Sequence, residues 1–145
     1  MIDKLLSLFE DPKPQKAQHT LDLACAVLLV EIMKADYELL EDEKNSLKAL
    51  LRSFFSLSEA ESQLLLEQAE QASAQSNDLF QYTDIINKHW QLEDKFKLIQ
   101  GLWQVAYSDN HLDKYEEYMI RKISDLLYLP HSQFIRAKLS VTPTR

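Results

Sequence analysis

The chain has 145 residues, of which 46% are hydrophobic and 27% are charged, a balance that suits one folded domain with a buried core. Its formal net charge of −7 argues against nucleic acid and anionic membrane surfaces as partners, because both are bound through cationic side chains. With a single glycine, Gly101, the chain also lacks the glycine-rich loops of nucleotide-binding proteins. Strand and hairpin signals are equally scarce, so the sequence predicts an all-α fold, a compact bundle of about seven to eight helices.

Hydrophobic periodicity and the breaks between periodic stretches define the predicted helices. The helix that begins near Gln15 is apolar on nearly every side in its middle, which predicts a central buried helix. Ser58 with Glu61 forms a capping box, and Asp78 is expected to cap the helix after that. Gly101 is unfavourable inside a helix, and close approach of a neighbouring helix would explain it. In chain order, the predicted helices cover residues 2–9, 15–35, 41–55, 58 up to the polar ASAQSN stretch, 78–90, 92–108, 113–128 and 131–139.

The single cysteine and the start of the chain bear on the compartment. Cys25 lies in the apolar stretch LACAVLLV, which predicts a buried, unreactive thiol and no disulfide within the chain. The start MIDKLLSLFEDPKP is too short and too acidic for a signal peptide, and the longest uncharged apolar run, residues 23–30, is too short to cross a bilayer. We therefore expect a cytoplasmic protein without direct membrane insertion.

Two stretches of the chain resemble each other when the sequence is laid over itself with position 36 on position 109. Asp36 then aligns with Asp109 and Glu43 with Glu116, and apolar positions on both sides agree as well. This pattern predicts one domain over residues 1–145 with two helix–loop–helix repeats, the first over about residues 17–75 and the second over about residues 92–140. Two such units in a pseudo-twofold arrangement would bury their apolar helices against each other.

The repeated acids Asp36, Glu43, Asp109 and Glu116 are candidate metal ligands. One pair alone offers too few oxygens for Ca²⁺, which takes about 6–8 ligands. Two facing pairs, with backbone carbonyls and water, could hold Ca²⁺ or Mg²⁺. Four further side chains lie close enough in sequence to supplement the site: Glu38, Asp42, His111 and Asp113.

The same acids have a purely structural interpretation. Asp113 with Glu116 fits a second capping box, and Asp36 and Asp109 could end helices and form turns. Glu43 falls in a first helical turn, where negative charge stabilises the helix dipole by about 0.3–1 kcal/mol. The residues alone leave both interpretations open.

The order of apolar helix, aspartate, leucine, glutamate and second helix occurs twice, in KADYELLEDE and YSDNHLDKYEE. This arrangement resembles the TerB-like family, named for tellurite-resistance protein B, over roughly residues 17–140. The resemblance implies an all-α domain in which acidic positions of the two halves come together, divalent-metal binding, and a role in stress-linked complexes near the membrane. It favours a non-catalytic protein that binds a divalent metal through Asp36, Glu43, Asp109 and Glu116 and works with an unidentified protein partner.

Two other functions are compatible with the sequence. The chain could be a protein-interaction scaffold whose acids only cap helices, or a metal-dependent hydrolase that uses the same acids. Other metal proteins fit poorly: no glycine stands at the sixth position of an EF-hand loop, no Glu-x-x-His pair supports a di-iron bundle, and no Cys/His cluster supports zinc.

Overall fold

The structure, a computed structural model, describes residues 14–34, 41–75, 78–107 and 114–141, without the side chains of residues 14–19, 42 and 43. Within these ranges the chain forms helices and no strand, which confirms the all-α prediction. The helix predicted over residues 2–9 lies outside the described part. The described helices are α2 (Pro14–Met33), α3 (Glu41–Phe55), α4 (Glu59–Gln75), α5 (Phe80–His89), α6 (Leu92–Ala106), α7 (Lys114–Leu126) and α8 (His131–Val141).

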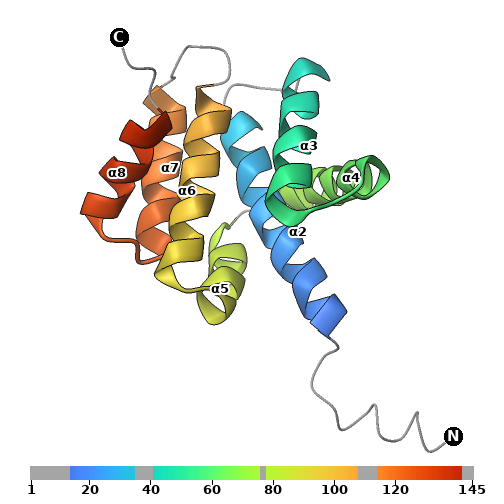
Figure 1. The fold of residues 1–145 in the computed structure, drawn as a ribbon, viewed down its shortest axis with the longest axis horizontal. Coiled ribbons are helices and arrows are strands. Elements are labelled where there is room, and N and C mark those ends of the chain that lie inside the picture. The colour runs from blue at the N-terminus through green and yellow to red at the C-terminus, as the bar shows by residue number, and fades with distance from the viewer. Residues whose placement is uncertain (1–13, 35–40, 76–77, 108–113, 142–145) are drawn as a thin grey trace, which may run out of the picture.

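Helix α2 runs through the middle of the molecule (Figure 1) and contacts α3, α4, α5, α6 and α7. All of residues 24–30 are buried, because neighbours cover every side of this apolar stretch. Leu28 is fully buried, and burial of a side chain of this size is worth about 1.5–3 kcal/mol. The prediction of a central buried helix is therefore confirmed.

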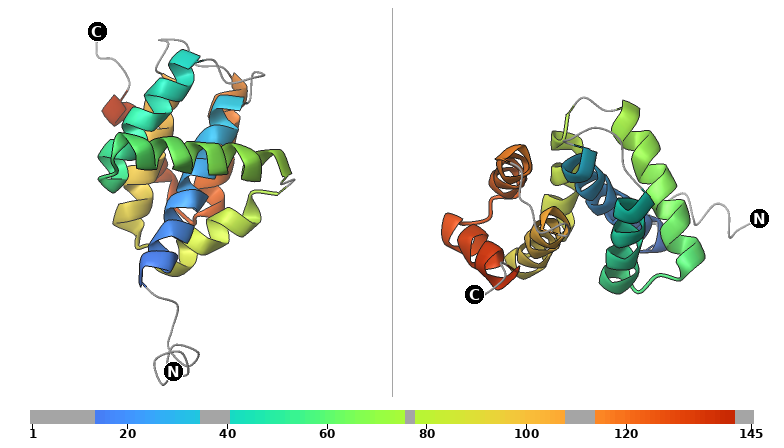
Figure 2. Two further views of the ribbon diagram at one scale, coloured as in Figure 1. Left: turned by 90° about the vertical axis from the view of Figure 1, so that its right-hand side faces the viewer. Right: turned by 90° about the horizontal axis from the view of Figure 1, so that it is seen from above.

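The other helices form two groups around α2. Helices α6, α7 and α8 lie on one side, α3 and α4 lie on the other, and α5 lies at the end opposite the start of α3 (Figures 1 and 2). Trp103 of α6 is fully buried, and its ring centre lies 5.4 Å from that of Phe134 on α8. The buried hydrophobic side chains of the described residues form one cluster, whose members range from Leu21 on α2 to Ala137 on α8.

Local polar contacts mark where α4 and α5 begin. The backbone N–H of Glu61 donates to Ser58 Oγ at 3.1 Å, and the Ser58 N–H donates back to Glu61 Oε1 at 2.9 Å. This is the predicted capping box at the start of α4. Before α5, Asp78 Oδ1 accepts the N–H of Phe80 at 2.9 Å, as predicted.

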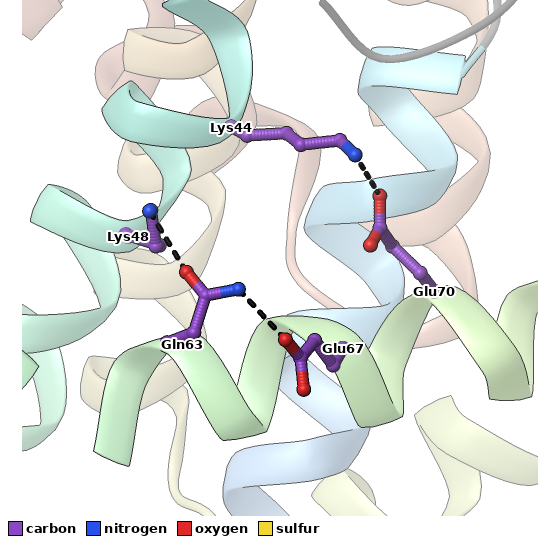
Figure 3. A network of polar contacts seen from close by, with 5 residues as sticks. All are labelled: Lys44, Lys48, Gln63, Glu67 and Glu70. Atoms are coloured by element: carbon purple, nitrogen blue, oxygen red, sulfur yellow. Dashed lines mark hydrogen bonds and ion pairs between the residues drawn. The ribbon is translucent and has the colours of Figure 1, made fainter. Parts of the chain in front are cut away.

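Surface pairs join α3 to α4 (Figure 3). Lys44 Nζ lies 3.5 Å from Glu70 Oε1, and Lys48 Nζ donates to Gln63 Oε1 at 2.9 Å. The amide of Gln63 donates in turn to Glu67 at 2.8 Å. An ion pair near the surface contributes about 0–1 kcal/mol, so the Lys44–Glu70 pair adds little to the packing of α3 on α4.

Gly101 lies on the side of α6 that faces α3. A methyl group built at this position would meet Leu50 Cδ2 at 3.7 Å, an ordinary van der Waals distance. The expected close approach of a neighbouring helix therefore does not explain the glycine, because an alanine would also fit.

None of the helices in the described ranges combines the length and the apolar character that a bilayer crossing requires.

Candidate functional site

The repeated acids lie in two connections and in the first turns of the helices that follow them. The first elbow, residues 35–40, joins α2 to α3, and the second elbow, residues 108–113, joins α6 to α7. The four helix ends that flank them lie at the same end of the molecule, at the top of Figure 1 and again in the left view of Figure 2. Helix α2 contacts α6 and α7, and α3 contacts α6, so these ends belong to elements that pack on one another.

The candidate ligands differ in how far the structure describes them. Asp36 and Asp109 belong to the elbows and lie outside the described residues. Glu43 lies in the first turn of α3, but its side chain is outside the description. Glu116 is fully described, and it lies in the first turn of α7. The supplementary positions Glu38, Asp42, His111 and Asp113 also fall outside the described side chains.

Glu116 is a buried carboxylate, only 7% exposed. Moving an ionised group away from water is costly unless it has partners of opposite or polar character. The first turn of a helix offers partial compensation, because its free N–H groups carry positive partial charge. Glu116 is engaged in a polar interaction, as this cost requires.

Glu61 shows that a glutamate can cap a helix in this chain without being buried. Glu61 is the glutamate of the capping box of α4, and its side chain is exposed. Hydrogen bonds from Ser58 lower the pKa of Glu61, so the carboxylate is held in its charged form without burial. A capping glutamate therefore needs no burial in this chain, and the position of Glu116 exceeds what a cap requires.

Two lysines border the first elbow, and both contact α4. Lys34, directly after α2, donates from Nζ to Ser73 Oγ at 3.2 Å, and the Ser73 hydroxyl donates to the carboxylate of Glu31. Lys44, in the first turn of α3, pairs with Glu70. Partners on α4 thus hold both cationic groups.

The second elbow has different neighbours. Tyr107, at the end of α6, stacks on Trp103 with 6.0 Å between ring centres. Glu117, next to Glu116 on α7, accepts from Lys138 Nζ at 3.2 Å and lies 3.9 Å from Arg121. An aromatic ring and an acid–base cluster thus border this elbow, where two lysines border the first.

Two possible nucleophiles of the described part, Ser73 and Cys25, are closed to substrate. Ser73 lies between Glu31 and Lys34, a combination that no spacing in the sequence revealed, but it is only 3% exposed. It links α2 to α4. Cys25 is fully buried, and burial together with the charge of Asp22 raises the pKa of its thiol well above the usual value. The prediction of a buried cysteine is confirmed, and the raised pKa keeps the thiol protonated and unreactive.

Among the described side chains, no three or more of His, Cys, Asp and Glu group closely enough to hold a metal ion. Three of the four predicted ligand side chains lie outside this part of the chain, so the four-acid site stays a prediction.

A family model described as "Tellurite resistance protein TerB" matches residues 22–139, a range that includes both elbows and all four acids. Neither a curated protein nor a solved structure matches the chain.

Proposed function

Because the chain belongs to the family of the tellurite resistance protein TerB, we propose that it is a non-catalytic helical module that binds one divalent cation between its two elbows. Asp36 and Glu43 would supply ligands from the first repeat, and Asp109 and Glu116 from the second. The physiological role that fits this chemistry is a stress-linked, tellurite-resistance-like one, exercised through a protein partner.

The burial of Glu116 is the observation that carries the proposal. Its carboxylate lies in the first turn of α7, next to the second elbow, where a cation would add to the compensation that its existing polar interaction provides for the loss of water. The exposed Glu61 performs a capping role without such a cost. A site that needs a negative charge at this place accounts for the difference.

The arrangement of the helix ends supports a shared site. The ends of α2 and α6 and the starts of α3 and α7 lie at one end of the molecule (Figure 1). Acids on both elbows would therefore project from neighbouring elements. Four carboxylates with backbone and water oxygens suit hard cations, so Ca²⁺ or Mg²⁺ is favoured over softer metals.

Titration calorimetry with Ca²⁺, Mg²⁺, Mn²⁺ and Zn²⁺ tests the proposal. We expect binding of at least one hard cation, and a tenfold or greater loss of affinity in Asp36→Asn, Asp109→Asn and Glu116→Gln. Asp125→Asn is the matched control, because this exposed acid lies at the opposite end of α7 and should leave affinity unchanged. At an ion concentration about 100 times the Kd, binding should add about 2.7 kcal/mol to the free energy of unfolding.

The scaffold function is the second candidate, and two observations favour it. The carboxylates of Asp78 and Glu61 accept backbone N–H groups at the starts of α5 and α4, so this chain does use acids to cap helices. Tyr115 and Tyr118 are exposed on α7, and tyrosine is frequent in protein interfaces. If none of the four ions gives heat or raises the melting temperature, the metal proposal is wrong and the scaffold function takes its place.

A further inference from the structure

The outer face of α6 carries a groove that the metal proposal does not use. One hollow of about 520 Å³ lies between α6 and α8, and another of about 420 Å³ lies between α3 and α6. Lys97 and Gln100 line both hollows, so the two form one surface, which we call the α6 groove. Figure 1 shows α6 between α8 and α3.

The only glycine of the chain lies in this groove. Gly101 lines the hollow between α3 and α6, in the interior of a helix, where glycine is destabilising relative to alanine. Packing does not demand it, because a methyl group there would only touch Leu50 at 3.7 Å. A side chain at position 101 would, however, fill part of the hollow. Glycine at position 101 therefore keeps the hollow between α3 and α6 deeper than a larger residue would.

The groove combines apolar surface with positive charge. Leu92 is 50% exposed, and Phe96 and Phe54 are partly buried along the same face. Arg136 lies over the ring of Phe96, 4.8 Å from its centre. Such a strip suits an amphipathic helix laid into a groove.

Charge identifies the kind of helix. Lys97 stands where the hollows meet, and Arg136 lies on the rim, where its guanidinium also donates to Gln133 at 3.3 Å. Among the described residues that line the groove, Glu93 is the only acid. The groove therefore carries net positive charge on a chain whose net charge is −7.

We propose that the α6 groove binds an acidic amphipathic helix of a protein partner. Apolar side chains of that helix would lie against Phe96 and Phe54, and its carboxylates would pair with Lys97 and Arg136. The groove spans positions 92–104, about 18 Å of helix at 1.5 Å per residue, so a partner segment of about 12–14 residues matches its length. This binding requires no metal ion.

Fluorescence anisotropy with synthetic helices tests the proposal in the presence of a chelator. The probe is a fluorescein-labelled peptide of about 14 residues with leucines at i, i+3, i+7 and i+10 and glutamates on its polar face. The matched peptide carries lysines in place of the glutamates. We expect saturable binding of the acidic peptide, weakened by salt, and at least tenfold weaker binding of the basic one.

Variants locate the binding surface. Lys97→Glu should weaken binding of the acidic peptide at least tenfold, and Gly101→Leu should do so by filling the hollow. Lys122→Glu is the matched control, because Lys122 is exposed on α7 and its replacement changes the net charge equally. Circular dichroism melting curves would show that each variant is folded.

Three outcomes would overturn the proposal. The first is equal affinity for the acidic and basic peptides, and the second is unchanged binding in the folded Lys97→Glu variant. The third is a dimer of the chain alone, seen by sedimentation, that Lys97→Glu dissociates. In that case a second copy of the chain occupies the groove.

Discussion

The two halves of the molecule, α2 to α4 and α6 to α8, repeat an order of elements but use it differently. Helices α2 and α6 end at Met33 and Ala106, and α3 and α7 begin at Glu41 and Lys114, so both pairs of boundaries keep the offset that aligns Asp36 with Asp109. Helix α2 contacts α4 and α7, and α6 contacts α8 and α3, the exchange of partners that a pseudo-twofold arrangement would produce. Pseudo-twofold symmetry itself stays a prediction.

The ends of α3 and α7 show a small drift within this repeat. Ser56 and Tyr128 have positive φ values of 55° and 58°. The N–H groups that follow them, of Leu57 and Leu129, donate to the carbonyls of Arg52 and Ser124 at 3.1 Å, as in a Schellman motif. Under the offset of the repeat, Ser56 would align with Leu129 rather than with Tyr128, so the second half is slightly shorter between helix start and helix end.

The halves differ most in the surroundings of α2 and α6. The middle of α2, residues 24–30, is covered on all sides, whereas α6 is buried on one side and presents the α6 groove on the other. Position 30 of α2 is a valine, and the matching position 103 of α6 is a tryptophan packed against Phe134. At these matching positions, α2 contributes a small side chain that several helices cover, and α6 contributes one large ring that packs against α8.

The largest expected effect tests this difference. Trp103→Ala should lower the free energy of unfolding by about 3–5 kcal/mol, because it leaves a large cavity between α6 and α8. Val30→Ala, at the matching position, removes less volume and should cost about 1–2 kcal/mol. Urea denaturation would measure both values.

Trp103→Phe is the control for the Trp103 prediction. It keeps an aromatic ring in the cavity and removes the indole N–H, which has no hydrogen-bond partner among the described residues. Its cost should fall well below that of Trp103→Ala. Equal costs for Val30→Ala and Trp103→Ala would contradict the contrast between the halves.

A smaller effect is expected at the two helix ends. Tyr128 and Ser56 adopt the left-handed conformation that favours glycine, and both side chains are exposed. Tyr128→Gly and Ser56→Gly should each raise the free energy of unfolding by about 0.5–1 kcal/mol, measured by thermal melting. Tyr128→Ala is the control, since alanine keeps the unfavourable Cβ. A lower melting temperature for both glycine variants would show that these side chains stabilise the turns in another way.

The smallest expected effect is a pH dependence in the first half. Hydrogen bonds from Ser58 lower the pKa of Glu61 in the folded state, so the unfolded state binds more protons in the acid range. The resulting stability is fully present above the unfolded pKa of about 4.3 and is lost as the pH falls through the lowered folded pKa. Glu61→Gln should therefore show a shallower loss of stability below about pH 4.3 than the parent chain does. The measurement is the free energy of unfolding from urea denaturation at a series of pH values. The same dependence on pH in the variant and the parent chain would refute the prediction.

The features that the sequence predicted correctly are those that depend on residues close together in the chain. The capping box joins Ser58 to the nearby Glu61, and the buried stretch of α2 is a continuous apolar run, so both follow from local spacing. The link between Glu31 and Ser73 joins residues far apart in the chain, and the α6 groove joins Lys97 on α6 to Arg136 on α8. Contacts of this kind arise only when helices pack, and no periodicity in the chain encodes them.

At the candidate site, too, the sequence predicted the residue but not its surroundings. The repeated spacing identified Glu116, but its burial depends on how α7 packs in the assembled fold. The glycine at position 101 was visible in the sequence, yet its place in a groove required three helices to be in position.

The central position of α2 also governs how the molecule comes apart. Five of the described helices pack against α2, so neither half can separate without exposing the shared core. We therefore expect unfolding to be one cooperative transition. Cys25 lies fully enclosed on that helix. A thiol reagent can reach Cys25 only when the core opens. The rate at which such a reagent modifies Cys25 therefore measures exposure of the whole core and not local fluctuation of the outer helices.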